Sequence, residues 1–244
     1  MPEPKIEIYS SLQEVVERGA RLLRQRVEAT DPRSGLMPFR LALSGGRTPA
    51  GMFDRLRELE LSPEAIARLH IFWADERCVP PDDPRSNYHL AWDLWLRHLP
   101  LAPEQIHRIH AERGEEAAAL YEREIRAHFG LRSRGYPRFD LILLGLGEDG
   151  HTASLFPKTG ALSDRRLATY SLAPYEPRER ISLTLPVLNR AKEVVFLVSG
   201  AAKAEALRRV LEEGPMSGLP AALVRPKAGE IRWLVDQEAA RLLR

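Results

Sequence analysis

Residues 39–49 read FRLALSGGRTP, a short apolar run followed by two glycines and, after two polar residues, a proline. The run 39–43 has the composition of a buried strand, and residues 49–59 have the spacing of an amphipathic helix. The glycines allow a tight turn between the two segments, and proline is common in the first turn of a helix. A strand joined directly to a helix is the repeating unit of α/β proteins, so this stretch predicts a parallel sheet covered by helices.

The same alternation of strand and helix patterns continues on both sides of this stretch. The predicted strands are 6–9, 39–43, 69–73, 139–144, 167–172, 181–185, 194–198 and 231–235. The predicted helices are 12–28, 49–59, 87–98, 115–129, 201–212 and 237–243, with candidate caps at Ser11, Thr48 before Pro49, Ser86 and Asp236. Exposed connections are expected at 131–137 and 173–180. We therefore predict a single α/β domain, residues 1–244, with a largely parallel sheet.

Composition argues against several classes of protein. The chain has no apolar start of the signal-peptide type and no run near the roughly 20 apolar residues of a membrane span, so neither secretion nor membrane insertion is expected. Cys78 is the only cysteine, which excludes an intrachain disulfide and fits the reducing cytoplasm. The formal net charge is +2 and both signs are scattered, so nucleic acid is not an expected partner. Monomer and small homo-oligomer both remain open.

The loop 44–49 is a candidate phosphate site, because ligands collect at the carboxyl ends of the strands in an open parallel sheet. Its backbone amides, the hydroxyl groups of Ser44 and Thr48, and the dipole of the following helix can together hold a phosphate. The loop lacks the Gly-Lys-Ser/Thr ending of a nucleoside triphosphate loop. A turn that merely joins a strand to a helix is the alternative.

Charged residues follow two further predicted strands. Asp75 and Arg77 follow strand 69–73, where they either pair with other charges or bind a polar substrate. Lys203 follows strand 194–198 and lies in the first turn of a predicted helix. A cation there opposes the helix dipole unless an anion binds nearby, so phosphate is an attractive explanation and a solvated lysine is the other.

The segment 143–157, LLGLGEDGHTASLFP, contains a glycine pattern that matches two classes of protein. Gly145, Gly147 and Gly150 fit the dinucleotide-binding fingerprint, which would make the chain a nicotinamide-dependent dehydrogenase. That fingerprint should open a helix, yet Pro157 soon interrupts the segment. No acidic residue ends a clear next strand about 20 positions later, where the fingerprint requires one.

Asp149 and His151 flank one glycine in this loop. A carboxylate placed there can orient an imidazole, and a neutral imidazole can take a proton from water. We expect the other six histidines to be ordinary surface or core residues.

Taken together, the segments 44–49, 75–77 with 86–87, 145–157 and 200–203 resemble the 6-phosphogluconolactonase family over nearly the whole chain. The resemblance implies a three-layer α/β fold, with an open, mainly parallel sheet and helices on both faces, similar to that of glucosamine-6-phosphate deaminases and ribose-5-phosphate isomerases. It also implies a hydrolase that needs no metal and no other cofactor. The implied substrate is a small phosphosugar lactone, 6-phosphoglucono-1,5-lactone, in the second step of the oxidative pentose phosphate pathway.

The resemblance also implies a role for individual residues. His151 would be the general base that activates water against the C1 carbonyl, and Asp149 would orient its ring. The residues implied to hold the 6-phosphate are Arg77, Lys203 and Arg180 or its neighbour Arg178, with further donors from Gly45, Gly46 and Thr48. Asp75 and Asn87 would contact sugar hydroxyls or support the loop.

Two alternatives to the lactonase are related phosphosugar proteins. Glucosamine-6-phosphate deaminases share the Gly-His segment but read GHIAFNEP, and this chain has Phe156 where they have the glutamate. A non-catalytic phosphosugar sensor would keep the cavity, but such proteins usually carry a DNA-binding module, and none is recognisable here.

Overall fold

The computed structural model describes residues 3–29, 37–132 and 134–244. Its centre is a seven-stranded sheet with the strand order β1-β10-β9-β6-β2-β3-β5, and all neighbouring strands are parallel. The strands are β1 (Lys5–Tyr9), β2 (Phe39–Leu43), β3 (Leu69–Trp73), β5 (Ile106–His107), β6 (Leu141–Leu144), β9 (Glu193–Val198) and β10 (Glu230–Asp236). The predicted α/β fold with an open, mainly parallel sheet is confirmed.

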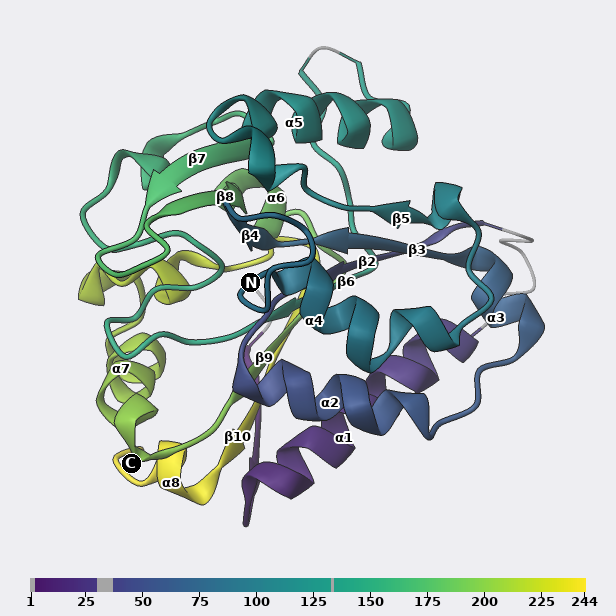
Figure 1. Ribbon diagram of the computed structural model, residues 1–244. Coiled ribbons are helices and arrows are strands. Elements are labelled where there is room, and N and C mark those ends of the chain that lie inside the picture. Colours follow the sequence, from purple (N-terminus) through teal and green to yellow (C-terminus); the bar gives the residue numbers. More distant parts are fainter. Residues whose placement is uncertain (1–2, 30–36, 133) are drawn as a thin grey trace.

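Helices cover both faces of this sheet, and Figure 1 shows α5 on one side with α1 and α2 on the other. The helices are α1 (Leu12–Glu28), α2 (Arg47–Arg57), α3 (Pro63–Arg68), α4 (Asn87–Leu94), α5 (Glu116–Phe129), α6 (Leu185–Leu188), α7 (Ala204–Arg208) and α8 (Gln237–Ala240). Short 3-10 turns lie at Leu96–His98, Pro103–Gln105, Ala111–Arg113, Gly160–Ser163, Ala201–Lys203, Gly214–Ser217 and Pro220–Leu223. None of the described helices is long and apolar enough to cross a membrane.

Burial on both faces explains why the central strands lack polar alternation. Every residue of β6 and β9 is buried, as expected for parallel strands between two helical layers. Strands β9 and β10 also pack through their side chains, since the rings of Phe196 and Trp233 stack with centroids 3.8 Å apart. The buried apolar residues form one continuous cluster across the sheet.

The predicted strands 167–172 and 181–185 exist but do not belong to the parallel sheet. They are β7 (Ala168–Leu172) and β8 (Glu179–Leu183), which form an antiparallel three-stranded sheet with β4 (Asp75–Arg77). The connection between β7 and β8 is only residues 173–178, too short for the crossover that parallel strands require. The prediction of exposure for 173–180 is wrong at both ends, since Ala173 is buried and Arg180 lies buried in β8.

The predicted helix caps are confirmed except at Thr48. Ser11, Ser86 and Asp236 each accept a hydrogen bond from a backbone N–H in the first turn of the following helix. Helix α2 instead begins at Arg47, and its cap is Gly46, whose φ of +109° favours glycine. Thr48 is therefore inside the first turn, where its hydroxyl makes no capping bond.

Several predicted helices are shorter than their apolar spacing suggests. The prediction 87–98 stops at Leu94, because Trp95 leaves the helical conformation and stacks its buried ring on Phe53. The prediction 201–212 divides into a 3-10 turn, α7 and a π-helical turn at Arg209–Glu213, and the prediction 237–243 ends at Ala240. Apolar spacing alone therefore overestimates the length of these helices.

Tyr121 offers a test of how α5 is attached to the sheet. Its buried hydroxyl accepts a hydrogen bond from the Trp73 amide at 2.9 Å and donates one to the Trp73 carbonyl oxygen at 2.8 Å. Tyr121→Phe leaves both backbone groups without these bonds, so we expect a loss of about 1–3 kcal/mol in the free energy of unfolding, measured by urea denaturation. Tyr136→Phe is the control, because the Tyr136 hydroxyl donates to the exposed Arg165 carbonyl oxygen, to which water can donate instead. An equal loss of stability in both variants would contradict this account.

Candidate active site

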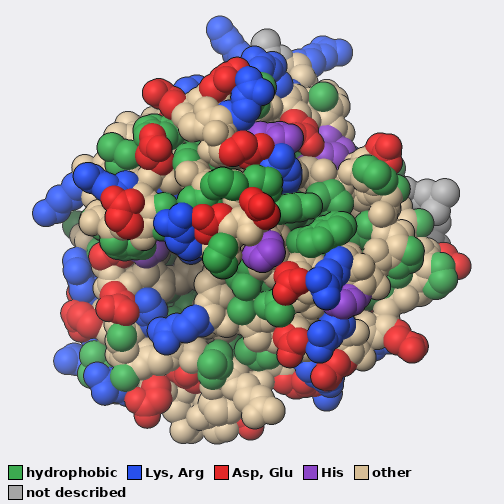
Figure 2. All heavy atoms as spheres, in the orientation of Figure 1, with side chains coloured by type: hydrophobic (Ala, Val, Ile, Leu, Met, Phe, Trp, Pro, Cys, Tyr) green, Lys and Arg blue, Asp and Glu red, His purple; other side chains and the backbone are tan. Residues whose placement is uncertain are grey.

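A cavity of about 400 Å³ opens at the carboxyl ends of β2, β6 and β9. Figure 2 shows this region of the surface hollowed between the β4–β8–β7 sheet and α7, with Lys and Arg side chains at its edge. All the predicted site residues except Asp149 line the cavity: Gly45, Gly46, Thr48, Asp75, Arg77, Asn87, His151, Arg180 and Lys203. The three loops that follow these strands, together with the second sheet, therefore bring the predicted residues to one place.

His151 and Asp149 form a hydrogen-bonded pair at the cavity. The distance from His151 Nδ1 to Asp149 Oδ1 is 2.5 Å, and the same oxygen accepts the His151 backbone amide at 3.1 Å. Burial alone would raise the pKa of Asp149, but the hydrogen bonds from His151 lower it below its usual value. The carboxylate therefore holds the proton on Nδ1, and the lone pair of Nε2 faces the cavity, 3.4 Å from the Tyr175 hydroxyl oxygen.

Gly147 makes this pair possible. A Cβ atom at residue 147 would lie 1.9 Å from His151 Nδ1 and 2.6 Å from Asp149 Oδ1. The turn closes through bonds from the Gly147 amide to the His151 carbonyl oxygen and from the Gly150 amide to the Gly147 carbonyl oxygen. The absence of a side chain at Gly147 thus leaves room for the imidazole. A dinucleotide site would require a helix directly after the loop, and no helix follows here among the described residues.

Two arginines lie opposite each other beside the cavity. Arg77 of β4 and Arg180 of β8 are direct partners in the antiparallel pair, so their side chains project from the same face. Arg180 is 3% exposed, and burial followed by the charge of Arg77 lowers its pKa. Among the described residues, neither arginine forms a salt bridge with Asp or Glu. Two adjacent cations without a carboxylate partner favour a bound anion.

Arg180 is thus distinguished from its sequence neighbour Arg178. Arg178 is exposed and does not line the cavity. Lys203 also lines it, at the end of the 3-10 turn Ala201–Lys203, and its Nζ atom lies 3.6 Å from Glu148 Oε1. The Glu148 side chain is mostly exposed, so this weak pair leaves Lys203 available to an anion in the cavity.

Two buried polar atoms at the cavity have no hydrogen-bond partner within the described residues. They are Ser44 Oγ and Asn87 Oδ1, which belong to residues that are 4% and 2% exposed. A Cβ atom at residue 45 would lie 1.8 Å from Asn87 Oδ1, so Gly45 is needed to let the two loops approach. An unsatisfied buried polar atom is costly, and a hydroxylated or phosphorylated ligand would satisfy both.

Asp75 and Asn87 both support the loop as well as line the cavity. Asn87 Nδ2 donates to the Asp75 carbonyl oxygen at 2.8 Å, and the Ser154 hydroxyl donates to Asp75 Oδ2 at 2.7 Å. Between them, the buried Glu76 carboxylate accepts the backbone amides of Asn87 and Tyr88 at 2.7 Å each. These hydrogen bonds join β4 to the start of α4 beside the cavity.

Tyr175 is a cavity residue that the sequence did not reveal. Its hydroxyl oxygen lies 3.4 Å from His151 Nε2, and its ring packs edge-on against Phe156. It belongs to the connection 173–178, and only its being a large aromatic residue in a connection predicted to be exposed could have drawn notice. The ring of Phe156 also contacts the His151 imidazole, with centroids 4.7 Å apart.

The chain matches known proteins over nearly its whole length. Residues 10–233 match the family model described as glucosamine-6-phosphate isomerases/6-phosphogluconolactonase. The chain belongs to this family. It is 38% identical to the 6-phosphogluconolactonase of Synechocystis sp., over 99% of each chain. It is 40% identical to the human 6-phosphogluconolactonase, over 98% of this chain and 93% of the human protein.

Solved structures of the family have the same fold. The 6-phosphogluconolactonase of Trypanosoma brucei superposes with a TM-score of 0.87 at 27% identity, over 99% of both chains. A monomeric glucosamine-6-phosphate deaminase superposes with a TM-score of 0.81 at 21% identity, which shows a shared fold alone. The predicted likeness to both branches of the family is confirmed at the level of fold.

Gly147→Ala tests the packing of the loop that holds the imidazole. The added methyl group would overlap His151, so we expect the free energy of unfolding to fall by about 1–3 kcal/mol. Gly145→Ala is a matched control in the same loop, because its Cβ would meet nothing within 4 Å, and it should change stability by less than about 0.5 kcal/mol. Urea denaturation of both variants checks this, and the idea fails if the two behave alike.

Proposed function

We propose that this chain is a 6-phosphogluconolactonase, which hydrolyses 6-phosphoglucono-1,5-lactone to 6-phosphogluconate in the oxidative pentose phosphate pathway. The observation that carries the proposal is the cavity itself, which joins a carboxylate-oriented imidazole to two arginines without carboxylate partners. A neutral base and an anion site are the two features that hydrolysis of a phosphorylated lactone requires. The 38–40% identity to named 6-phosphogluconolactonases over almost the full chain supports the same activity.

In the proposed mechanism, His151 is the general base. Its Nε2 atom takes a proton from a water molecule while the water oxygen bonds to C1 of the lactone, giving a tetrahedral oxyanion. The bond from C1 to the ring oxygen then breaks, and the imidazolium returns its proton to that oxygen. Asp149 stabilises the imidazolium between these steps through its hydrogen bond to Nδ1.

The positive side of the cavity would hold the 6-phosphate and so place C1 beside His151. Arg180, Arg77 and Lys203 supply the charge, and the loop Gly45–Thr48 would add backbone and hydroxyl donors. The free Asn87 Oδ1 and Ser44 Oγ suit sugar hydroxyls. This positioning supplies much of the catalysis, because the reacting water and carbonyl no longer have to find each other by diffusion.

The proposed route uses protein groups and water and requires no cofactor. We place the enzyme in the cytoplasm, where its single cysteine needs no disulfide partner. Cys78 is half-buried, and burial raises the pKa of its thiol to about 12, so it is a poor nucleophile. The deaminase alternative is disfavoured because Phe156 stands where the deaminase motif has its glutamate, and its phenyl ring packs on the imidazole.

His151→Ala tests the base. We expect kcat for lactone hydrolysis to fall by at least about 100-fold, which is the lower range for loss of a general base, while affinity for 6-phosphogluconate changes little. The lactone is generated in situ by glucose-6-phosphate dehydrogenase, and its loss is compared with the spontaneous rate. A variant that retained the wild-type rate would refute the assignment, and a wild-type protein that binds 6-phosphogluconate without accelerating hydrolysis would point to a sensor.

Arg180→Ala tests the phosphate site. Loss of a charge-assisted contact worth about 1.5–3 kcal/mol should raise KM for the phosphorylated lactone by roughly 10- to 100-fold. The same variant should act on unphosphorylated gluconolactone as the wild type does. The matched control is Arg178→Ala, which removes an exposed arginine outside the cavity. Equal losses on both lactones would show that Arg180 supports the fold and does not select the phosphate.

A further inference from the structure

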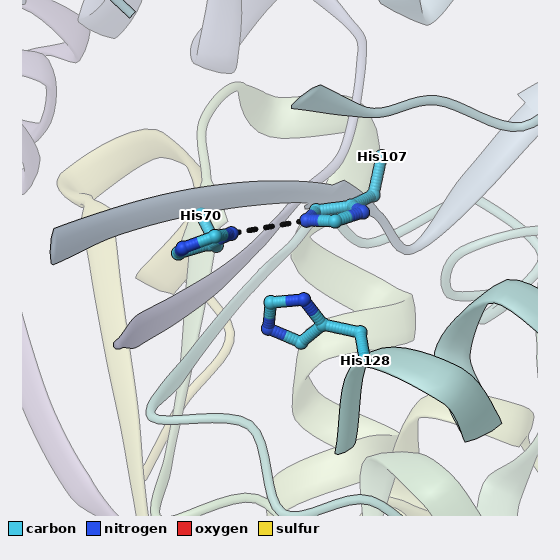
Figure 3. Close-up of side chains that lie close together, drawn as sticks. All are labelled: His70, His107 and His128. Carbon is cyan, nitrogen blue, oxygen red and sulfur yellow. Dashed lines mark hydrogen bonds between the residues drawn. The ribbon is translucent and has the colours of Figure 1, made fainter. Parts of the chain in front are cut away.

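Three histidines outside the active site converge at one edge of the sheet. His70 comes from β3, His107 from the edge strand β5, and His128 from the last turn of α5. Figure 3 shows the His70 and His107 imidazoles joined by a hydrogen bond with the His128 ring beside them, and one nitrogen of each lies within 4.8 Å of the other two. None of them lines the cavity that contains His151.

The spacing of the nitrogens is close to that of a metal site. Three imidazole nitrogens bound to one tetrahedral zinc ion at about 2.0–2.1 Å lie about 3.4 Å from one another. Here His70 Nδ1 and His107 Nε2 are joined by a hydrogen bond of 3.1 Å, and the His128 nitrogen lies inside the 4.8 Å limit. Small side-chain rotations would therefore bring the three nitrogens to ligand distance from one ion.

His107 is held in the orientation that a metal ligand needs. Its Nδ1 atom lies 2.9 Å from Glu124 Oε1, so the carboxylate fixes the proton on Nδ1 and leaves the lone pair of Nε2 directed at the cluster. Metal-binding histidines commonly donate their second N–H to such a carboxylate. Glu124 lies one helical turn before His128 on α5, so a single helix supplies both a histidine and the supporting carboxylate.

The His128 imidazole has a nitrogen whose burial no hydrogen bond within the described part of the chain offsets. Its Nε2 atom is buried and has no hydrogen-bond partner among the described residues, a costly state for a polar nitrogen.

Two features of the surroundings oppose metal binding. The Arg40 guanidinium stacks on Phe129 near the cluster, and its charge weakens the attraction for a dication. The His107 ring also stacks on Phe72 with centroids 4.2 Å apart, as it would in a purely aromatic cluster. The Glu124 carboxylate offsets the charge of Arg40, and packing alone leaves the buried nitrogen of His128 without a partner.

We propose that His70, His107 and His128 bind one divalent transition-metal ion, with zinc as the preferred ion and a fourth position open to water. Imidazole suits zinc and its neighbours in the first transition series, and the small cluster has no set of oxygen ligands for magnesium or calcium. The ion would join β3, β5 and α5, and so would fasten an edge strand of only two residues.

The test is a titration of untagged, chelator-treated protein with cobalt(II), followed by visible absorption, and then displacement with zinc. We expect one equivalent per chain, an intense tetrahedral spectrum, and a thermal midpoint that rises with metal concentration. His128→Phe keeps an aromatic ring and removes both nitrogens, and it should weaken binding at least about 100-fold. Glu124→Gln should weaken it by about 10- to 100-fold while leaving all three ligands in place.

Two control variants test whether the ion binds at the three histidines. His98→Gln removes an exposed histidine outside the cluster and should bind as the wild type does. His151→Ala should also retain the cobalt spectrum, because the active-site imidazole is not part of the cluster. The proposal is overturned if the wild type shows no saturable binding, if Glu124→Gln and His128→Phe both bind normally, or if the spectrum disappears in His151→Ala. If His128→Phe does not fold, the wild-type titration and Glu124→Gln decide.

Discussion

The buried carboxylate of Glu76 holds the active-site side of the molecule together. It is 3% exposed and accepts the backbone amides of Arg77, Asn87 and Tyr88 and the hydroxyl of Ser86. Burial raises the pKa of Glu76 to about 7, and the donated hydrogen bonds work against that rise. Through these bonds β4 is tied to the first turn of α4, and that connection fixes the residues on either side of Glu76.

The second sheet depends on this connection. Because β4 is held in place, β8 can pair with it, and the pairing sets Arg180 opposite Arg77. Like charges in directly opposed positions destabilise an antiparallel pair, and burying Arg180 adds a desolvation cost. In the proposed function, the phosphate group of the substrate would neutralise both cations.

The histidine loop has a different physical origin from the phosphate side. His151 and Asp149 are positioned by local steric requirements, because a side chain at Gly147 would overlap both. The large rings of Phe156 and Tyr175 complete the surroundings of the pair. In the proposed function, the turn would place the base and the second sheet would place the phosphate of one substrate.

The sequence by itself determined the alternation of strands and helices, the loops 44–49 and 145–157, and the pairing of Asp149 with His151. These features follow from periodicity and from glycine sterics, which act over a few neighbouring residues. Tertiary structure alone decided that β7 and β8 leave the parallel sheet, that Arg180 is buried, and that His70, His107 and His128 meet. Those outcomes depend on contacts between segments far apart in the chain, whose pairing leaves no local pattern in the sequence.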